Sequence, residues 1–202
     1  VTADFNNNNA NLINRLNNVE VDEISNQDLK KITDTKNPSG IIGVMEPPNG
    51  DAEKMNQRII ILDNIADPGN LGTILRTANW FGFNNVVLSQ KSVDHYNPKV
   101  VRSAMGAHFN MNIDRCEIYS YIQRLKSKDF HIIAADLNTN HSIEKLKLNN
   151  HKWALLMGSE AHGISKSISS LIDNRIKISQ IGKIESLNVS VACGIFLYHI
   201  SK

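Results

Sequence analysis

The feature that most constrains this chain is a series of short, continuous apolar runs separated by amphipathic segments. "RIIILD" at 58–63 and "KWALLMG" at 152–158 have no polar side chain in their interiors. A strand that is apolar on both faces is typical of a parallel sheet that is covered by helices on both sides. We therefore predict an α/β fold with a mainly parallel sheet flanked by helices.

The expected elements alternate from residue 57 to the end of the chain. Strands are predicted at 58–63, 84–89, 109–114, 130–136, 152–158 and 175–179. Helices are predicted at 70–81, from Pro98 onward, at 118–129, at 142–148 and at 186–200. The last of these, "SLNVSVACGIFLYHI", is apolar nearly all round, so we expect it to be buried against the sheet or against a second subunit.

The first 50 residues differ from the rest in being largely polar. "QDLKKITD" at 27–34 predicts a short helix with Ser25 as its N-cap, "IIGVM" at 41–45 predicts a strand, and "EPPNGD" at 46–51 reads as a linker. We interpret the asparagine run at 6–9 as coding bias or a flexible segment. Too little apolar material lies here for an independent core, so we predict a partial small domain over 1–50 and the main domain over 56–202.

The overall composition limits which binding partners and which cellular compartment are expected for this protein. The 202 residues carry a formal net charge of +2, which permits a nucleic-acid partner without requiring one. The two cysteines, Cys116 and Cys193, lie far apart and form no CxxC, so neither a disulfide scaffold nor a zinc site is expected. No apolar run is long enough to span a membrane. We predict a cytoplasmic protein with no metal and no membrane association.

The stretch "DPGNLGTILRTANWFG" at 67–82 joins a glycine-containing turn to a helix. Its glycines do not have the GxGxxG spacing of a dinucleotide-binding loop, and no GxxxxGK[ST] is present. One interpretation is a simple turn in which Asp67 caps the helix. The other is a loop that presents Asn70 and Arg76, which would lie on different faces of an ideal helix. A functional arginine in this position requires an anion.

Two further stretches combine a strand with a glycine-containing loop. "LLMGSEAHGIS" at 155–165 places Gly158 and Glu160 directly after an apolar strand, where ligands bind in open α/β sheets. "IKISQIGKIESLNVSVACGIF" at 176–196 places a glycine loop before a helix, with Ser186 as its expected N-cap and Asn188 in its first turn. Taken singly, each is also compatible with an ordinary turn.

Together, these three stretches resemble in order and spacing the three motifs of the SpoU/TrmH family of RNA 2′-O-ribose methyltransferases, a branch of the SPOUT superfamily. The resemblance covers about residues 57–201, and "RSAMGAHFNMNI" at 102–113 is similar to the segment between the first two motifs. Residues 21–45 are similar to the end of the small L30e-like substrate-binding domain that often precedes the catalytic domain. The resemblance implies a C-terminal trefoil knot, S-adenosylmethionine as cofactor, RNA (ribosomal or transfer) as substrate, and a homodimer.

The resemblance also implies roles for particular residues. The asparagine and arginine of the first motif match Asn70 and Arg76, the glutamate of the second matches Glu160, and the serine and asparagine of the third match Ser186 and Asn188. These five are the expected catalytic residues. The positions that match the cofactor-binding backbone are Gly158, Ile178 and Leu187.

The third motif departs from the family pattern at one position, because Ser179 stands where a proline is usual. Proline fixes φ and removes a hydrogen-bond donor, so the loop that holds the cofactor is expected to differ in shape or rigidity here.

The reaction implied by the resemblance moves a methyl group from a sulfonium to a ribose 2′-hydroxyl by in-line displacement. The nucleophile is a weakly acidic hydroxyl, so the protein must orient it and stabilise developing negative charge. Arg76 can do so by a charge-assisted hydrogen bond, but a guanidinium group stays protonated, which argues against a free-standing general base. The alternative function is that of a non-catalytic RNA-binding relative that retains the fold. A Rossmann-type nucleotide enzyme is disfavoured by the missing GxGxxG.

Overall fold

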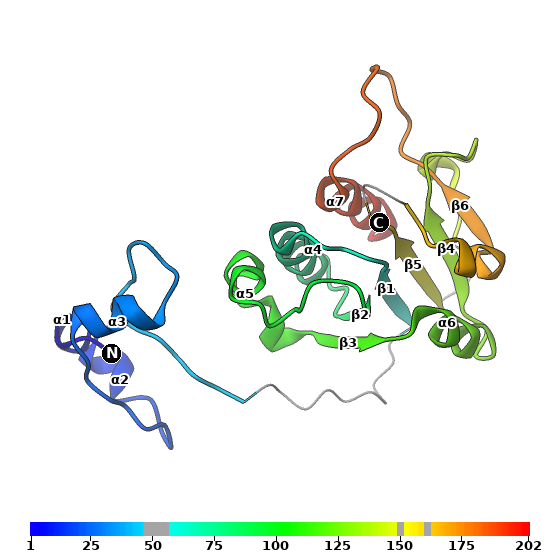
Figure 1. The fold of residues 1–202 in the computed structure, drawn as a ribbon. Helices are drawn as coiled ribbons and strands as arrows, with labels where there is room; N and C mark the ends of the chain where they lie inside the picture. Colours follow the sequence, from blue (N-terminus) through cyan, green and yellow to red (C-terminus); the bar gives the residue numbers. More distant parts are fainter. Residues whose placement is uncertain (47–56, 149–151, 160–162) are drawn as a thin grey trace. The chain divides into compact units, whose positions relative to one another are not determined.

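The computed structural model describes residues 1–46, 57–148, 152–159 and 163–202. The chain divides into two compact units, Val1–Asn49 and Gly50–Lys202. Figure 1 shows the helices of the first unit in blue and the sheet-containing second unit from cyan to red. Within the described residues, no helix has the length and apolar character needed to cross a membrane.

The first unit consists of three short helices with very little core. They are α1 (Ala3–Asn8), α2 (Ala10–Ile13) and α3 (Asn26–Ile32). Ser25 accepts a hydrogen bond from the backbone N–H of Asp28, which confirms the predicted N-cap. Among the described residues of this unit, Leu29 is the one buried hydrophobic side chain. The unit therefore gains little of the apolar burial that normally holds a domain together.

Two predictions for this unit differ from the structure. Of the two interpretations of the asparagine run, the flexible segment does not hold, since Asn6, Asn7 and Asn8 lie in α1, which Thr2 caps, and coding bias stays an interpretation. The predicted strand at 41–45 is not formed, and the described residues 41–46 have no helix or strand. Val44 is almost fully exposed, so no neighbouring element covers its side chain, and a lone strand without a partner is not stable in water.

The second unit is built on a six-stranded sheet in the order β3-β2-β1-β5-β4-β6, and every pairing is parallel. The strands are β1 (Arg58–Leu62), β2 (Asn85–Ser89), β3 (Asn112–Cys116), β4 (His131–Ala135), β5 (Trp153–Met157) and β6 (Asn174–Ile176). The predicted α/β fold with a mainly parallel sheet is therefore confirmed. All strands end on the same edge, where the functional motifs follow them.

Helices cover both faces of this sheet, which explains why the strands are apolar throughout. Side chains alternate along each strand. Ile60 and Leu62 therefore pack with α4 (Pro68–Trp80), α5 (Pro98–Ala104) and α7 (Val189–Ile200). Ile59 and Ile61 pack on the opposite face with α6 (Ile118–Lys126). Figure 1 shows the same arrangement, with α6 across the sheet from α4 and α7.

Several element boundaries differ from the predictions. Positive φ angles at Met105 and Gly106 end α5, and the 3-10 helix η1 (Ala107–Asn110) then delays β3, so the strand predicted at 109–114 is displaced. The helix predicted at 142–148 is only the 3-10 turn η2 (Ile143–Lys145). Another 3-10 helix, η3 (Lys166–Leu171), precedes β6, which is shorter than predicted.

The last helix, α7, is only half buried. Cys193 and Leu197 are fully enclosed, whereas Val191 and Tyr198 are each 52% exposed and Ile195 is 38% exposed. The exposed three are spaced at i, i+4 and i+7, so they lie along one stripe of the helix. The prediction of burial against the sheet is thus correct for one face, and the other face is an apolar surface of the second unit.

The edge strand β6 is tied to α6 by Asp173. The carboxylate of Asp173 accepts a hydrogen bond from the backbone N–H of Ile132 at 2.8 Å and forms an ion pair with Lys126. Partial burial raises the pKa of Asp173, but the Ile132 N–H and the Lys126 ammonium more than offset this effect, so its pKa lies below the ordinary value. The group therefore stabilises the folded state when it is ionised.

We expect Asp173→Asn to lower the free energy of unfolding at pH 7 by about 1 kcal/mol. Because the folded-state pKa is depressed, the stabilisation is present above the unfolded-state pKa of about 4 and is lost as pH falls through the folded value. Urea unfolding followed at pH 7 and at pH 3 checks this. The difference between the two proteins should shrink at the lower pH, and a constant difference would contradict the assigned role.

Candidate functional site

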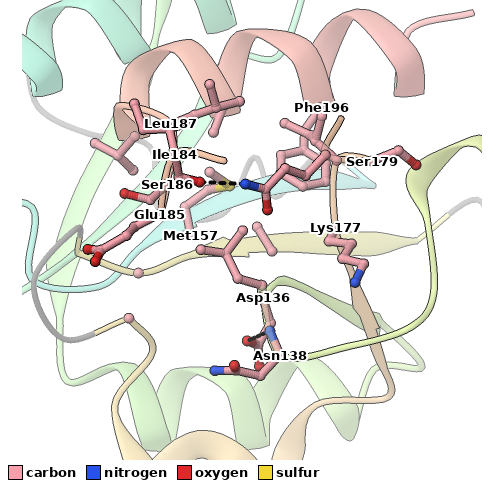
Figure 2. Close-up of a pocket in the computed structure, with 18 of the residues that line it drawn as sticks. Asp136, Asn138, Met157, Lys177, Ser179, Ile184, Glu185, Ser186, Leu187 and Phe196 are labelled. Atoms are coloured by element: carbon pink, nitrogen blue, oxygen red, sulfur yellow. Dashed lines mark hydrogen bonds between the residues drawn. The ribbon is translucent and has the colours of Figure 1, made fainter. Parts of the chain in front are cut away.

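A cavity of about 500 Å³ lies at the carboxyl edge of the sheet, next to the ends of β4, β5 and β6. Its walls come from residues 135–138, 157–159, 163–164, 177–182 and 184–187 and from the inner face of α7. Figure 2 shows α7 above this cavity, with Met157 near its centre and Asp136 and Asn138 on the opposite side. A cavity of this size suits a small organic molecule.

The loop after β5 depends on a close approach between two stretches of backbone. The N–H of Ser159 donates to the carbonyl of Gly163 at 3.1 Å, and the N–H of Gly163 donates back to Ser159 at 2.8 Å. A methyl group on Gly158 would lie 2.3 Å from the carbonyl of Gly163 and 2.6 Å from the nitrogen of Ile164. Only glycine fits at 158, so this residue shapes the cavity wall.

The loop after β6 forms the largest part of the cavity wall. Ile178, Ser186 and Leu187 all line the cavity, together with Gly158 from the β5 loop. The three positions predicted to bind a cofactor, Gly158, Ile178 and Leu187, are therefore gathered around one space. Ile178 is half-buried, whereas Leu187 is 42% exposed at the mouth of the loop.

Asn188 joins this loop to the first motif. Its side-chain amide donates to Oδ1 of Asn70 at 2.9 Å, although the two residues are 118 positions apart. Its own Oδ1 accepts from the backbone N–H groups of Ser190 and Val191 and from the Ser190 hydroxyl. Both ends of the amide are thus engaged, which fixes its orientation.

The N-cap of the last helix differs from the prediction. α7 begins at Val189 with Asn188 as its N-cap, so Ser186 does not cap it. Asparagine is at least as good a cap as serine, because its Oδ1 reaches the second and third helical N–H groups. Ser186 instead lies two residues before the cap, exposed and on the wall of the cavity.

The first motif forms a capped helix rather than a phosphate-binding loop. Asp67 accepts from the N–H of Asn70 at 2.8 Å, and Pro68 occupies the first helical position. A methyl group on Gly72 would lie 1.9 Å from Oγ of Ser103. Gly72 is therefore required for the close packing of α4 on α5, and its function is structural.

Arg76 lies on an exposed position of α4, two turns after the helix start. Among the described parts of the chain, it forms neither an ion pair nor a hydrogen bond, so no carboxylate there accounts for it as a structural arginine. The structure brings Asn70 and Asn188 into contact but does not include Arg76 in that contact. Glu160 lies outside the described residues.

Other polar residues line the cavity that the sequence did not single out. Asp136 pairs with Arg175 and accepts from the N–H of Asn138, so its carboxylate is already engaged. Lys177 lines the same wall and is half-buried. Both residues follow directly after observed strands, β4 and β6, on the ligand-binding edge, whereas the sequence placed them inside the predicted strands at 130–136 and 175–179.

Neither cysteine has the character of a nucleophile. Both are free thiols, and burial raises the pKa of Cys193 to about 12 and that of Cys116 to about 11. The reactive thiolate is thus scarce at neutral pH.

In a comparison with known protein families, residues 57–198 match the SpoU rRNA Methylase family. Among curated proteins, the chain is 31% identical over 179 residues to the 23S rRNA (guanosine(2553)-2′-O)-methyltransferase RlmP of Bacillus subtilis, covering 88% of this chain and 71% of that one. The chain spans less of two other relatives, 66% of an uncharacterized tRNA/rRNA methyltransferase of Borreliella burgdorferi and 64% of one of Archaeoglobus fulgidus.

Solved structures give the same result for the fold. The rRNA methyltransferase of Sinorhizobium meliloti matches with a TM-score of 0.80 and 28% identity, covering 88% of this chain and 69% of that one. Its AdoMet-bound form matches with a TM-score of 0.76 and 26% identity over the same shares.

We predict that Gly158→Ala destabilises the second unit by about 3 kcal/mol, because the added methyl group would overlap backbone that cannot move independently. Gly182→Ala is the matched control in the neighbouring loop. A methyl group there meets nothing within 4 Å. Its effect should stay within about 0.5 kcal/mol. Thermal and urea unfolding of the two variants check this, and equal stabilities would show that the β5 loop relaxes freely.

Proposed function

We propose, since the chain belongs to the SpoU rRNA Methylase family, that it transfers a methyl group from S-adenosylmethionine to a ribose 2′-hydroxyl of RNA. The observation that carries this proposal is the hydrogen bond between Asn70 and Asn188. It links the helix that bears Arg76 to the loop that encloses the cavity. This one hydrogen bond therefore connects the helix that carries Arg76, the group for the substrate, to the wall of the cavity that would hold the methyl donor.

The cavity fits S-adenosylmethionine in size and in chemistry. Met157, Ile178, Leu187 and Phe196 supply apolar surface, and the loops around Gly158 supply backbone groups. Small-molecule sites combine a mainly apolar lining with a few polar groups in this way. When bound, S-adenosylmethionine supplies a methyl group that is already activated on a sulfonium.

The residues of this chain then have to orient and polarise the hydroxyl. Arg76 donates charge-assisted hydrogen bonds to the hydroxyl or to the adjacent phosphate, which favours the alkoxide-like charge as it develops. Asn70 and Asn188 orient the substrate and limit the motion of the helix start. Glu160 holds a donor of the substrate or of the protein, and Ser186 contacts ligand from the cavity wall.

We propose the remaining assignments on the strength of the resemblance to the family. The C-terminal region carries a trefoil knot, and the segment before it is the end of an L30e-like domain that selects RNA, ribosomal or transfer. Residues 1–50 and 56–202 are the corresponding parts of the chain, and the cytoplasm is their compartment. In support, the first unit has too little core to act alone, and the second unit contains the whole cavity.

The homodimer forms through the exposed stripe of α7. Val191, Ile195 and Tyr198 present apolar side chains in one row, and the ring of Tyr198 lies 6.1 Å from that of Phe81 on the neighbouring helix end. Trp80, the last residue of α4, is 83% exposed. Exposed aromatic and aliphatic side chains of this kind are typical of subunit interfaces.

We expect Arg76→Ala to reduce methyl transfer by at least about a hundredfold, the usual loss on removal of one charge-stabilising donor. Tritiated S-adenosylmethionine and total cellular RNA measure the transfer. Arg124→Ala is the matched control, since this arginine lies on α6 across the sheet. Unchanged transfer by Arg76→Ala would refute its role. Absence of transfer by the wild type together with absence of cofactor binding in calorimetry would favour a non-catalytic RNA-binding relative.

We expect Ile195→Glu to weaken dimerisation by at least about tenfold, because it places a charge in the centre of an apolar interface. Sedimentation equilibrium at micromolar protein checks this, with Gln123→Glu on the exposed side of α6 as control. A wild-type protein that sediments as a monomer would contradict the proposed interface.

A further inference from the structure

Ser179 takes part in a hydrogen-bonded ring that fastens the cavity loop to another part of the chain. Its hydroxyl donates to Oε2 of Glu144 at 3.1 Å and lies 2.9 Å from Oγ of Ser142. Since the single Ser179 proton goes to Glu144, the Ser142 hydroxyl donates to Ser179. The backbone N–H of Glu144 donates in turn to Oγ of Ser142 at 3.4 Å and closes the ring.

This ring lies where the backbone pairing between the two segments stops. The N–H of Ile143 donates to the carbonyl of Lys177 at 2.8 Å, and the N–H of Lys177 donates to the carbonyl of His141 at 2.9 Å. Among the described residues, no backbone bond joins these segments beyond Lys177. The Ser179 hydroxyl therefore extends the attachment by two residues toward the loop at 180–187.

That loop is held from its other end by Asn188. Between Ser179 and Asn188 it is exposed, and Ile181 is fully accessible to solvent. The same stretch supplies most of the cavity wall on this side, from Gln180 to Leu187. Figure 2 shows Ser179 on one side of the cavity and Leu187 on the other. The distance between the two attachment points thus limits the shapes that the wall can adopt.

We propose that Ser142, Glu144 and Ser179 form a polar latch that positions the cofactor-binding loop, replacing with side-chain hydrogen bonds what a proline at 179 would provide through a fixed φ. The three are positioning residues, since none is required to touch the reacting atoms. The inference rests on the proposed function for the identity of the ligand but not for the existence of the latch.

The existence of the latch can be tested in the protein without bound cofactor. Hydrogen exchange of the Ile143 and Lys177 amides, which bond across the two segments next to the ring, should be faster in cofactor-free Ser179→Ala and Glu144→Gln than in the wild type. Ser127→Ala is the matched control, because this exposed serine bonds only within its own helix end. Unchanged exchange in both latch variants would overturn the proposal.

Calorimetry with S-adenosylmethionine then tests the consequence for binding. Ser179→Ala and Glu144→Gln should each raise Kd about threefold to tenfold, the effect of one or two lost hydrogen bonds. Ser179→Thr should retain the affinity. KM for the cofactor should rise while kcat at saturation stays unchanged. The double variant should lose no more than either single one, since both break the same ring.

A proline variant separates the latch from a general effect on folding. Ser179→Pro should bind within about twofold of the wild type, and adding Glu144→Gln to it should change Kd by less than about twofold. Additive losses would overturn the latch. Failure of the wild type to bind S-adenosylmethionine would refute the proposed function alone, because hydrogen exchange would still decide whether the latch exists.

Discussion

The side chain of Asn188 connects parts of the molecule that the chain itself keeps far apart. Its oxygen caps α7 and its nitrogen bonds to Asn70 at the start of α4. Because a primary amide is planar, the position of one helix start constrains the position of the other. The cavity loop ends at this residue, so the geometry of the candidate site depends on both helices being in place.

The second unit also depends on two positions where the absence of a side chain lets neighbouring segments of the chain pack closely. Gly158 allows the β5 loop to fold against Gly163, and Gly72 allows α4 to pack directly on α5. The two glycines, one in a loop and one inside a helix, thus serve different purposes. One shapes a wall of the cavity, and the other sets the depth at which α4 lies on its neighbour. Neither is explained by the phosphate-binding role that glycine-containing turns before helices often have.

The central strands and the helix caps at Ser25 and Asp67 could be predicted from the sequence because they depend on local patterns. Continuous apolar runs identified β1, β2, β4 and β5, and Asp67 was recognisable as a cap. The hydrogen bond between Asn70 and Asn188 could not be derived from the sequence, since it depends on tertiary packing over 118 residues. The choice of Asn188 over Ser186 as N-cap of α7 was also inaccessible, because both residue types cap helices well.

The composition of α7 has a practical consequence for anyone who redesigns this protein. Its N-terminal end carries Asn188, its inner face fills the core with Cys193 and Leu197, and its outer face carries an exposed apolar row. Substitutions along α7 therefore risk disturbing either the core or the exposed apolar row. The helix Val189–Ile200 contains no Asp, Glu, Lys or Arg. Solubilising charges and labels belong instead on α6, whose outer side already carries Gln123, Arg124 and Lys126.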